Sequence, residues 1–90
     1  MSNEETTKLT RISLQNWGKE NNIELEVQTH SSPSFGYVTV VIVGDIKIFH
    51  YYDFQRILVM DSNRMISLEE VTPGLKISER IIQEIQKHLK

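Results

Sequence analysis

The sequence predicts an α+β fold, a two-layer sandwich in which an antiparallel five-stranded meander carries an N-terminal and a C-terminal helix on one face (α-β-β-β-β-β-α). Three observations predict it. Amphipathic helical patterns occupy both ends of the 90-residue chain. Five short β-rich segments lie consecutively between them. The connections between these segments are short and rich in turn-forming residues, which favours antiparallel neighbours.

Chain length and composition indicate one soluble domain. Residues 1–6 are polar and are expected to be disordered, and residues 7–90 are expected to form a single α+β domain. The chain contains no cysteine, which excludes disulfides and thiolate metal sites and favours a cytoplasmic protein, because small secreted domains usually need such cross-links. No apolar run approaches the roughly 20 residues that span a bilayer, so no membrane contact is expected.

The segment 7–21 has the pattern of a helix. Its expected apolar stripe contains Leu9, Ile12 or Ser13, and Trp17. Asn21 and Asn22 supply a left-handed stop after the last turn. An alternative starts the helix at Ser13 as N-cap and leaves residues 8–12 extended.

The segment 23–29 alternates between apolar and polar residues, which predicts a half-buried strand near a sheet edge. Its carboxylates, Glu24 and Glu26, occupy the solvent side, where charge keeps an edge strand soluble. After a loop over 30–36, the segment 37–43 is apolar at nearly every position. A strand that is apolar on both faces requires cover on both faces.

Gly44-Asp45 is a two-residue hairpin signal, and a tight turn there fixes the register of the flanking strands. The expected pairs include Val43 with Ile46, Thr39 with His50, and Tyr37 with Tyr52. One face then carries residues 37, 39, 41, 43, 46, 48, 50 and 52. The other carries Phe49 and Tyr51, which we expect to fill the core beneath the helices, so that the first set lies on the uncovered face.

The remaining elements follow the same rules. Residues 56–61 and 65–71 read as strands joined by a tight turn, and Thr72 to Gly74 ends the second of them. Either Thr72 with Pro73 begins the last helix, or Ser78 caps a shorter one. Its expected apolar stripe is Ile81, Ile82, Ile85 and Leu89, extended by Leu75. The expected outward-facing residues include Arg80 and Glu84.

Counting layers leads to a functional expectation. Five strands about 4.8 Å apart make a sheet roughly 20 Å wide, and each helix covers a strip about 10 Å wide. Two helices therefore cover one face only, and an apolar patch is left on the other, which usually marks an interaction site. We expect a non-enzymatic adaptor, inhibitor or regulator that binds a protein partner or a second copy of itself in a homodimer. The residues expected to line the contact are Tyr37, Thr39, His50 and Tyr52.

Catalysis and metal binding find little support in the sequence. In the segment FHYYDF, His50 and Asp53 are three residues apart at a strand end and are expected to point to different sides. The three histidines have no ligand-like spacing, and no cofactor or metal is expected. Asp45-Ile46-Lys47 has the acid-x-lysine form of some metal-dependent nuclease cores, but its first residue is explained by the hairpin turn.

Nucleic-acid binding is the alternative function. The order of helix, meander and helix resembles that of double-stranded RNA-binding domains, and LQNWGKENNI fits their first helix. Here two additional strands precede the last helix, and its start, LKISER, lacks the paired lysines of that family. The aromatic strand resembles the base-stacking strand of RNA-recognition motifs, but FHYYDF lacks the glycines and the basic residue of that signature. A net charge of -2 and scattered basic residues also disfavour a polyanion partner.

Overall fold

The computed structural model describes residues 3–71 and 76–89, and it confirms the predicted fold class: a helix, five antiparallel strands in one open sheet, and a helix. The strands lie in chain order across the sheet. The elements are α1 (Asn3–Glu20), β1 (Glu26–Ser32), β2 (Gly36–Val43), β3 (Ile46–Tyr51), β4 (Arg56–Asp61), β5 (Arg64–Glu70) and α2 (Ile77–His88).

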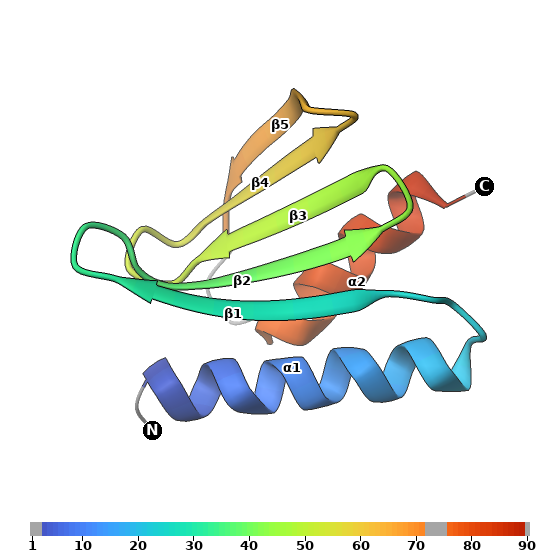
Figure 1. Ribbon diagram of the computed structural model, residues 1–90, viewed down its shortest axis with the longest axis horizontal. Helices are drawn as coiled ribbons and strands as arrows, with labels where there is room; N and C mark the ends of the chain where they lie inside the picture. The colour runs from blue at the N-terminus through green and yellow to red at the C-terminus, as the bar shows by residue number, and fades with distance from the viewer. Residues whose placement is uncertain (1–2, 72–75, 90) are drawn as a thin grey trace.

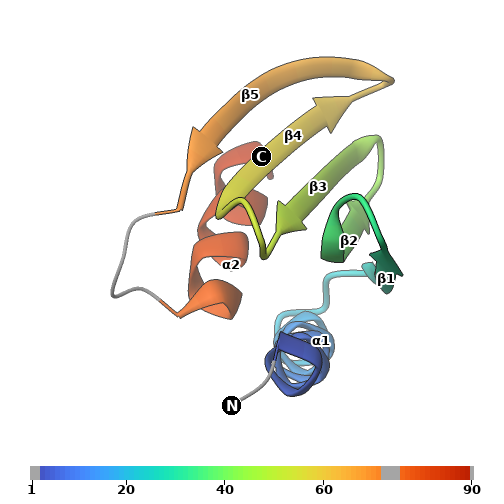
Figure 2. The same cartoon turned by 90° about the vertical axis from the view of Figure 1, so that its left-hand side faces the viewer.

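Both helices lie on the same side of the sheet (Figures 1 and 2). α1 packs on β1 and β2, α2 packs on β3, and the two helices also contact each other. The core between the layers is aliphatic, with Leu14 from α1 and Ile81 and Ile85 from α2 lying against strand residues such as Ile48. Each side chain of this size contributes roughly 1.5–3 kcal/mol when it is fully buried. The other side of the sheet has no helical layer among the described residues.

The first helix differs from the sequence prediction at both its start and its buried face. It begins at Asn3, so residues 3–6, which were expected to be disordered, are helical, and the alternative start at Ser13 is wrong. Leu9 and Ile12 are 51% and 43% exposed, which is also contrary to the prediction. The buried positions are Thr7, Thr10, Leu14 and Gly18.

Threonines can line this helix face because their hydroxyls find partners. Thr10 Oγ1 donates a hydrogen bond to the carbonyl of Thr6 at 2.8 Å and accepts one from the Tyr52 hydroxyl at 3.2 Å. A buried hydroxyl with such partners avoids most of the cost of leaving water. Small side chains also allow α1 to approach the sheet closely, and a scale based on hydrophobicity alone does not rank them as core residues.

The turns follow the predicted chemistry. Asn22 has a φ of 54° and ends the connection after α1 as expected, although β1 starts at Glu26 rather than at residue 23. Gly44 has a φ of 60° in the two-residue β2–β3 hairpin. Ser62 and Asn63, with φ of 51° and 70°, make the equivalent turn between β4 and β5. The predicted β2–β3 register is confirmed, with Val43 opposite Ile46 and Thr39 opposite His50.

The last helix begins at Ile77, preceded by Lys76 as N-cap, so Ser78 lies inside the helix and does not cap it. The predicted roles of Thr72, Pro73 and Leu75 lie outside the described residues. Ile81 and Ile85 are fully buried as predicted, whereas Leu89 is 39% exposed. Lys87 and His88 lie in the last turn, where positive charge favours the helix dipole.

Candidate interaction surface

The four residues predicted to line a contact do not lie on the uncovered side of the sheet. Thr39, His50 and Tyr52 are buried beneath the helices, with 0%, 0% and 4% of their surface exposed. Tyr37 is half-buried and lines a cleft with the first turns of α1. The register prediction is right and the face assignment is wrong, because Phe49 points to the uncovered side.

The charged residues decide which face stays open. Lys47 is two positions from Phe49 on β3, shares its face and is exposed. By register, Arg56 on β4 and Glu26 on β1 lie on the same side. A charge beneath the helices would lose its hydration without compensation, so this face must be the solvated one. In the sequence, charged residues at alternate positions of three strands indicate this solvated face. The aromatic residues between them obscure the pattern.

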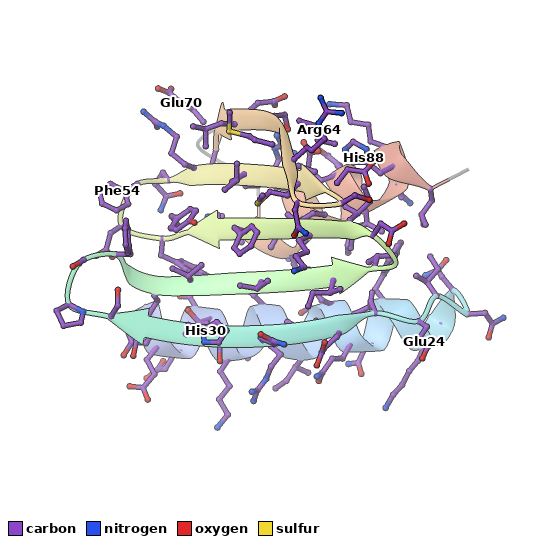
Figure 3. The ribbon with its side chains drawn as sticks, turned by 45° about the horizontal axis from the view of Figure 1, so that its top comes forward. Glu24, His30, Phe54, Arg64, Glu70 and His88 are labelled. Carbon is purple, nitrogen blue, oxygen red and sulfur yellow. The ribbon has the colours of Figure 1, made fainter. Side chains whose placement is uncertain are left out.

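We define the open face as the strand side chains that point away from both helices. By register they form three rows across the sheet: His30, Val38, Tyr51, Arg56 and Glu70; then Gln28, Val40, Phe49, Leu58 and Leu68; then Glu26, Ile42, Lys47, Met60 and Met65. The middle row is apolar apart from its first member, and the outer rows carry the charges. Figure 3 looks onto this face, with α1 and α2 behind the sheet.

Aromatic rings gather at one end of the open face. Phe49 and Tyr51 stack at 6.5 Å between ring centroids, and Phe35 lies 6.1 Å from Tyr51 and 6.3 Å from Phe54. Phe35 and Phe54 come from the loops at the ends of the strands and are 54% and 51% exposed. Phe35, Phe49 and Tyr51, together with Val38 and Val40, line a shallow hollow of about 510 Å³.

A glycine makes this end of the sheet possible. Gly36 has a φ of 69°, a conformation that L residues with a side chain rarely adopt. The Asp53 carboxylate occupies the space that a Cβ on Gly36 would need. The absence of a side chain therefore lets the β3–β4 turn approach the β1–β2 loop, and it brings the aromatic rings of the two loops together.

The charges on the open face balance one another. Arg56 and Glu70 form an ion pair at 3.1 Å, with side chains 43% and 77% exposed, and a pair this exposed contributes little to stability. Glu26 and Lys47 add one charge of each sign in the third row. The face therefore has an apolar centre and a mixed-charge periphery, which is the usual composition of a protein contact surface.

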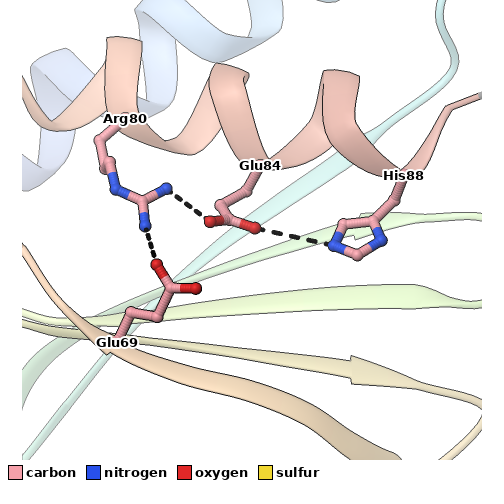
Figure 4. A network of polar contacts seen from close by, with 4 residues as sticks. All are labelled: Glu69, Arg80, Glu84 and His88. Carbon is pink, nitrogen blue, oxygen red and sulfur yellow. Dashed lines mark hydrogen bonds and ion pairs between the residues drawn. The ribbon is translucent and has the colours of Figure 1, made fainter.

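A second group of polar side chains lies on the other side of the sheet, between α2 and β5 (Figure 4). Arg80 donates to Glu84 at 2.6 Å and to Glu69 at 3.0 Å, and His88 lies 3.7 Å from Glu84. Arg80 and Glu84 were predicted to face outward, but they are 8% and 2% exposed. Their ion pair at i and i+4 makes burial of both charges possible, and it joins the helix to the edge of the sheet.

His50 is the third polar feature, and it is sealed in the core. Its ring lies edge-on to Tyr52 with 4.3 Å between centroids. Neither ring nitrogen has a hydrogen-bond partner among the described residues, and the neighbouring Thr39 hydroxyl has none either. Burial lowers the pKa of His50 from 6.5 to about 4, so the ring is neutral at physiological pH. Asp53, which follows His50 in the segment FHYYDF and was considered as its partner, lies in an exposed turn.

Other kinds of site were also sought in the described part of the chain. No three His, Asp or Glu side chains among residues 3–71 and 76–89 gather closely enough to hold a metal ion. No described helix is both long enough and apolar enough to cross a lipid bilayer.

Comparisons of the chain with protein-family models, with curated proteins and with solved structures gave no match. The functional argument therefore rests on the geometry of the open face.

Proposed function

We propose that this protein is a small, non-enzymatic interaction protein, an adaptor, inhibitor or regulator, whose open face binds another protein. The proposal retains the homodimer and the cytoplasmic location expected from the sequence. It replaces the predicted contact residues with those of the open face, centred on Phe49. The observation that carries it is the apolar middle row of a sheet whose helices lie entirely on the other side.

The size of the open face supports a protein partner. Five strands about 4.8 Å apart and three rows about 7 Å apart give a flat area of roughly 500 Å². This area, with the charged rows included, is about two-thirds of one side of a standard protein interface. The shallow hollow cannot enclose a small molecule in the way that ligand pockets do.

The buried polar groups support a non-enzymatic role. His50 is enclosed by the core, and the carboxylate of Glu84 is bound by Arg80 beneath α2. Neither group lies on the open face, where a partner or substrate would meet it. A general acid or base must come within hydrogen-bond reach of the reacting atom.

Photo-crosslinking tests the open face directly. A benzophenone amino acid placed at Phe49 is expected to form a protein adduct in a native lysate, and the adduct is expected to disappear when Leu58→Glu places a charge beside it. The same amino acid at Ile12, which is 43% exposed on the outer side of α1, serves as the matched control. Absence of an adduct at position 49, or an identical set of adducts at both positions, would contradict the proposal.

Single-stranded nucleic acid is a second candidate, favoured by one observation. The stacked pair of Phe49 and Tyr51 lies on an uncovered sheet face, where bases could stack on it, with Lys47 on the same strand. Binding of this kind weakens steeply as salt is raised, because counterions are released. Filter binding of labelled oligonucleotides at low salt decides the matter: no retention removes this candidate.

A further inference from the structure

We propose that two copies of this chain pair through the outer edge of β5, antiparallel and about a twofold axis at Ser67, so that their sheets join into one. The proposal assigns a surface to the homodimer of the proposed function, and it rests on that part alone. The open faces of the two copies would then lie side by side and remain free for a partner.

β5 is an uncovered sheet edge with apolar side chains. It is the outermost strand of the sheet, and within residues 3–71 and 76–89 it pairs only with β4. Met65, Ile66 and Leu68 are 65%, 46% and 56% exposed. Edge strands with exposed apolar residues tend to pair with another strand, and proteins that avoid this pairing cover or interrupt the edge.

The backbone of β5 presents free hydrogen-bonding groups outward at Leu68. The N–H of Val71 donates to the carbonyl of Gln55 at 2.9 Å, directly after the strand. Because backbone groups alternate in an antiparallel ladder, those of Glu69 and Ser67 also point toward β4. Those of Leu68 therefore point away from the sheet, whereas Ile66 is the extra residue of a bulge, because Ser67 pairs with Val59 and Met65 pairs with Met60. In pairing about Ser67, the free groups of Leu68 face Ile66 of the second copy.

The charges along β5 are complementary to those of a second copy of β5 that runs in the opposite direction. The strand reads RMISLEE, with Arg64 at one end and Glu70 at the other, as Figure 3 shows. Pairing about Ser67 places Arg64 opposite Glu70 of the second copy, and the twofold axis makes this contact twice. Glu70 already contacts Arg56 of its own chain, so Arg64 would complete a row of alternating charge. The bulge at Ile66 bends the strand, but the long Arg64 side chain can span the resulting gap.

The opposite edge of the sheet lacks these properties. β1 reads EVQTHSS, and pairing about its central Thr29 would place Glu26 opposite Ser32 and leave the carboxylate without a cation. α1 also packs against β1. Pairing of β1 with β5 of another copy is heterologous and extends into a ring or a fibre, whereas β5 with β5 closes after two copies.

A charge exchange between two copies tests both the surface and the register. Arg64→Glu and Glu70→Arg each place like charges at both contacts, so each variant alone is expected to dimerise about tenfold more weakly than the native chain. Mixed in equal amounts, they restore opposite charges at both contacts and are expected to form a one-to-one heterodimer with near-native affinity. Sedimentation equilibrium at low salt, up to roughly 1 mM protein, measures all four samples.

A backbone variant provides an independent test. Leu68→Pro removes an N–H that points outward, so it deletes a bond between copies without deleting one to β4. It is expected to weaken dimerisation at least as much as either charge variant, with the circular dichroism spectrum preserved. A native chain that stays monomeric at roughly 1 mM, or a mixture that does not restore association, would overturn the proposal.

The open face is read out separately. Arg64→Glu, which lies outside the open face, is expected to leave the adduct at position 49 unchanged, and Leu58→Glu is expected to leave the dimer unchanged. An adduct at position 49 with twice the mass of the chain would place the second copy on the open face and would overturn the edge assignment. Loss of every adduct, with charge exchange intact, would remove only the open-face proposal.

Discussion

The buried imidazole of His50 should make this protein sensitive to mild acid. The pKa of His50 falls from 6.5 to about 4 because burial disfavours the charged ring, and none of the described ion pairs involves His50. The unfolded chain therefore takes up a proton at a higher pH than the folded chain. The contribution to stability is complete above about pH 6.5, declines as the pH falls, and is lost near pH 4.

The size of this effect follows from the shift in pKa. One unit of pKa corresponds to about 1.4 kcal/mol, so the folded state loses about 3 kcal/mol relative to the unfolded state across this window. A domain of this size has a stability of only about 5–15 kcal/mol, so the loss is a large fraction of the whole. His50→Leu removes the titrating group and the two ring nitrogens that lack described partners. This variant is expected to be at least as stable as the native chain at neutral pH.

Urea unfolding followed by the fluorescence of Trp17, which packs against the core, measures both proteins between about pH 7 and pH 4. The carboxylates titrate in both, so the difference between the two curves isolates His50. We expect the native chain to lose about 3 kcal/mol more than His50→Leu across the range. Equal losses in the two proteins would refute the reasoning and show that His50 can be protonated in the fold without cost.

Three further predictions concern the fold. Gly36→Ala is expected to cost at least about 1 kcal/mol in urea unfolding, because an alanine must adopt a positive φ and displace the Asp53 carboxylate; an unchanged midpoint would contradict this packing. Glu84→Ala leaves the Arg80 guanidinium buried with only a half-exposed partner, and about 3 kcal/mol should be lost; a loss below about 1 kcal/mol would show that Arg80 reaches water instead. Tyr52→Glu buries a carboxylate in the core and is expected to unfold the chain, as circular dichroism would show; a folded variant would contradict the face assignment.

Much of the fold follows from local sequence chemistry. Gly44-Asp45 specifies a two-residue hairpin, and this turn fixes the register of β2 and β3 with no tertiary information. The order of the strands follows in the same way from short connections, and the stripe of Ile81 and Ile85 specifies the inner side of α2. Counting layers also predicts that one side of the sheet has no helices.

The choice of face, and therefore the candidate site, was decided by tertiary packing. Both faces of β2 and β3 are apolar, so hydrophobicity does not distinguish them, and the helices settle on the side where no charge such as Lys47 must be buried. Thr10 and Arg80 are core residues only because Tyr52 and Glu84 lie within reach. The first of these pairs joins residues of two different elements, and the second lies on a helix face that was expected to be exposed. The periodicity of a single segment therefore cannot predict either pair. The sequence by itself determined the order of the strands and the register of β2 with β3, and the structure determined which of the two sides of the sheet is available to a partner.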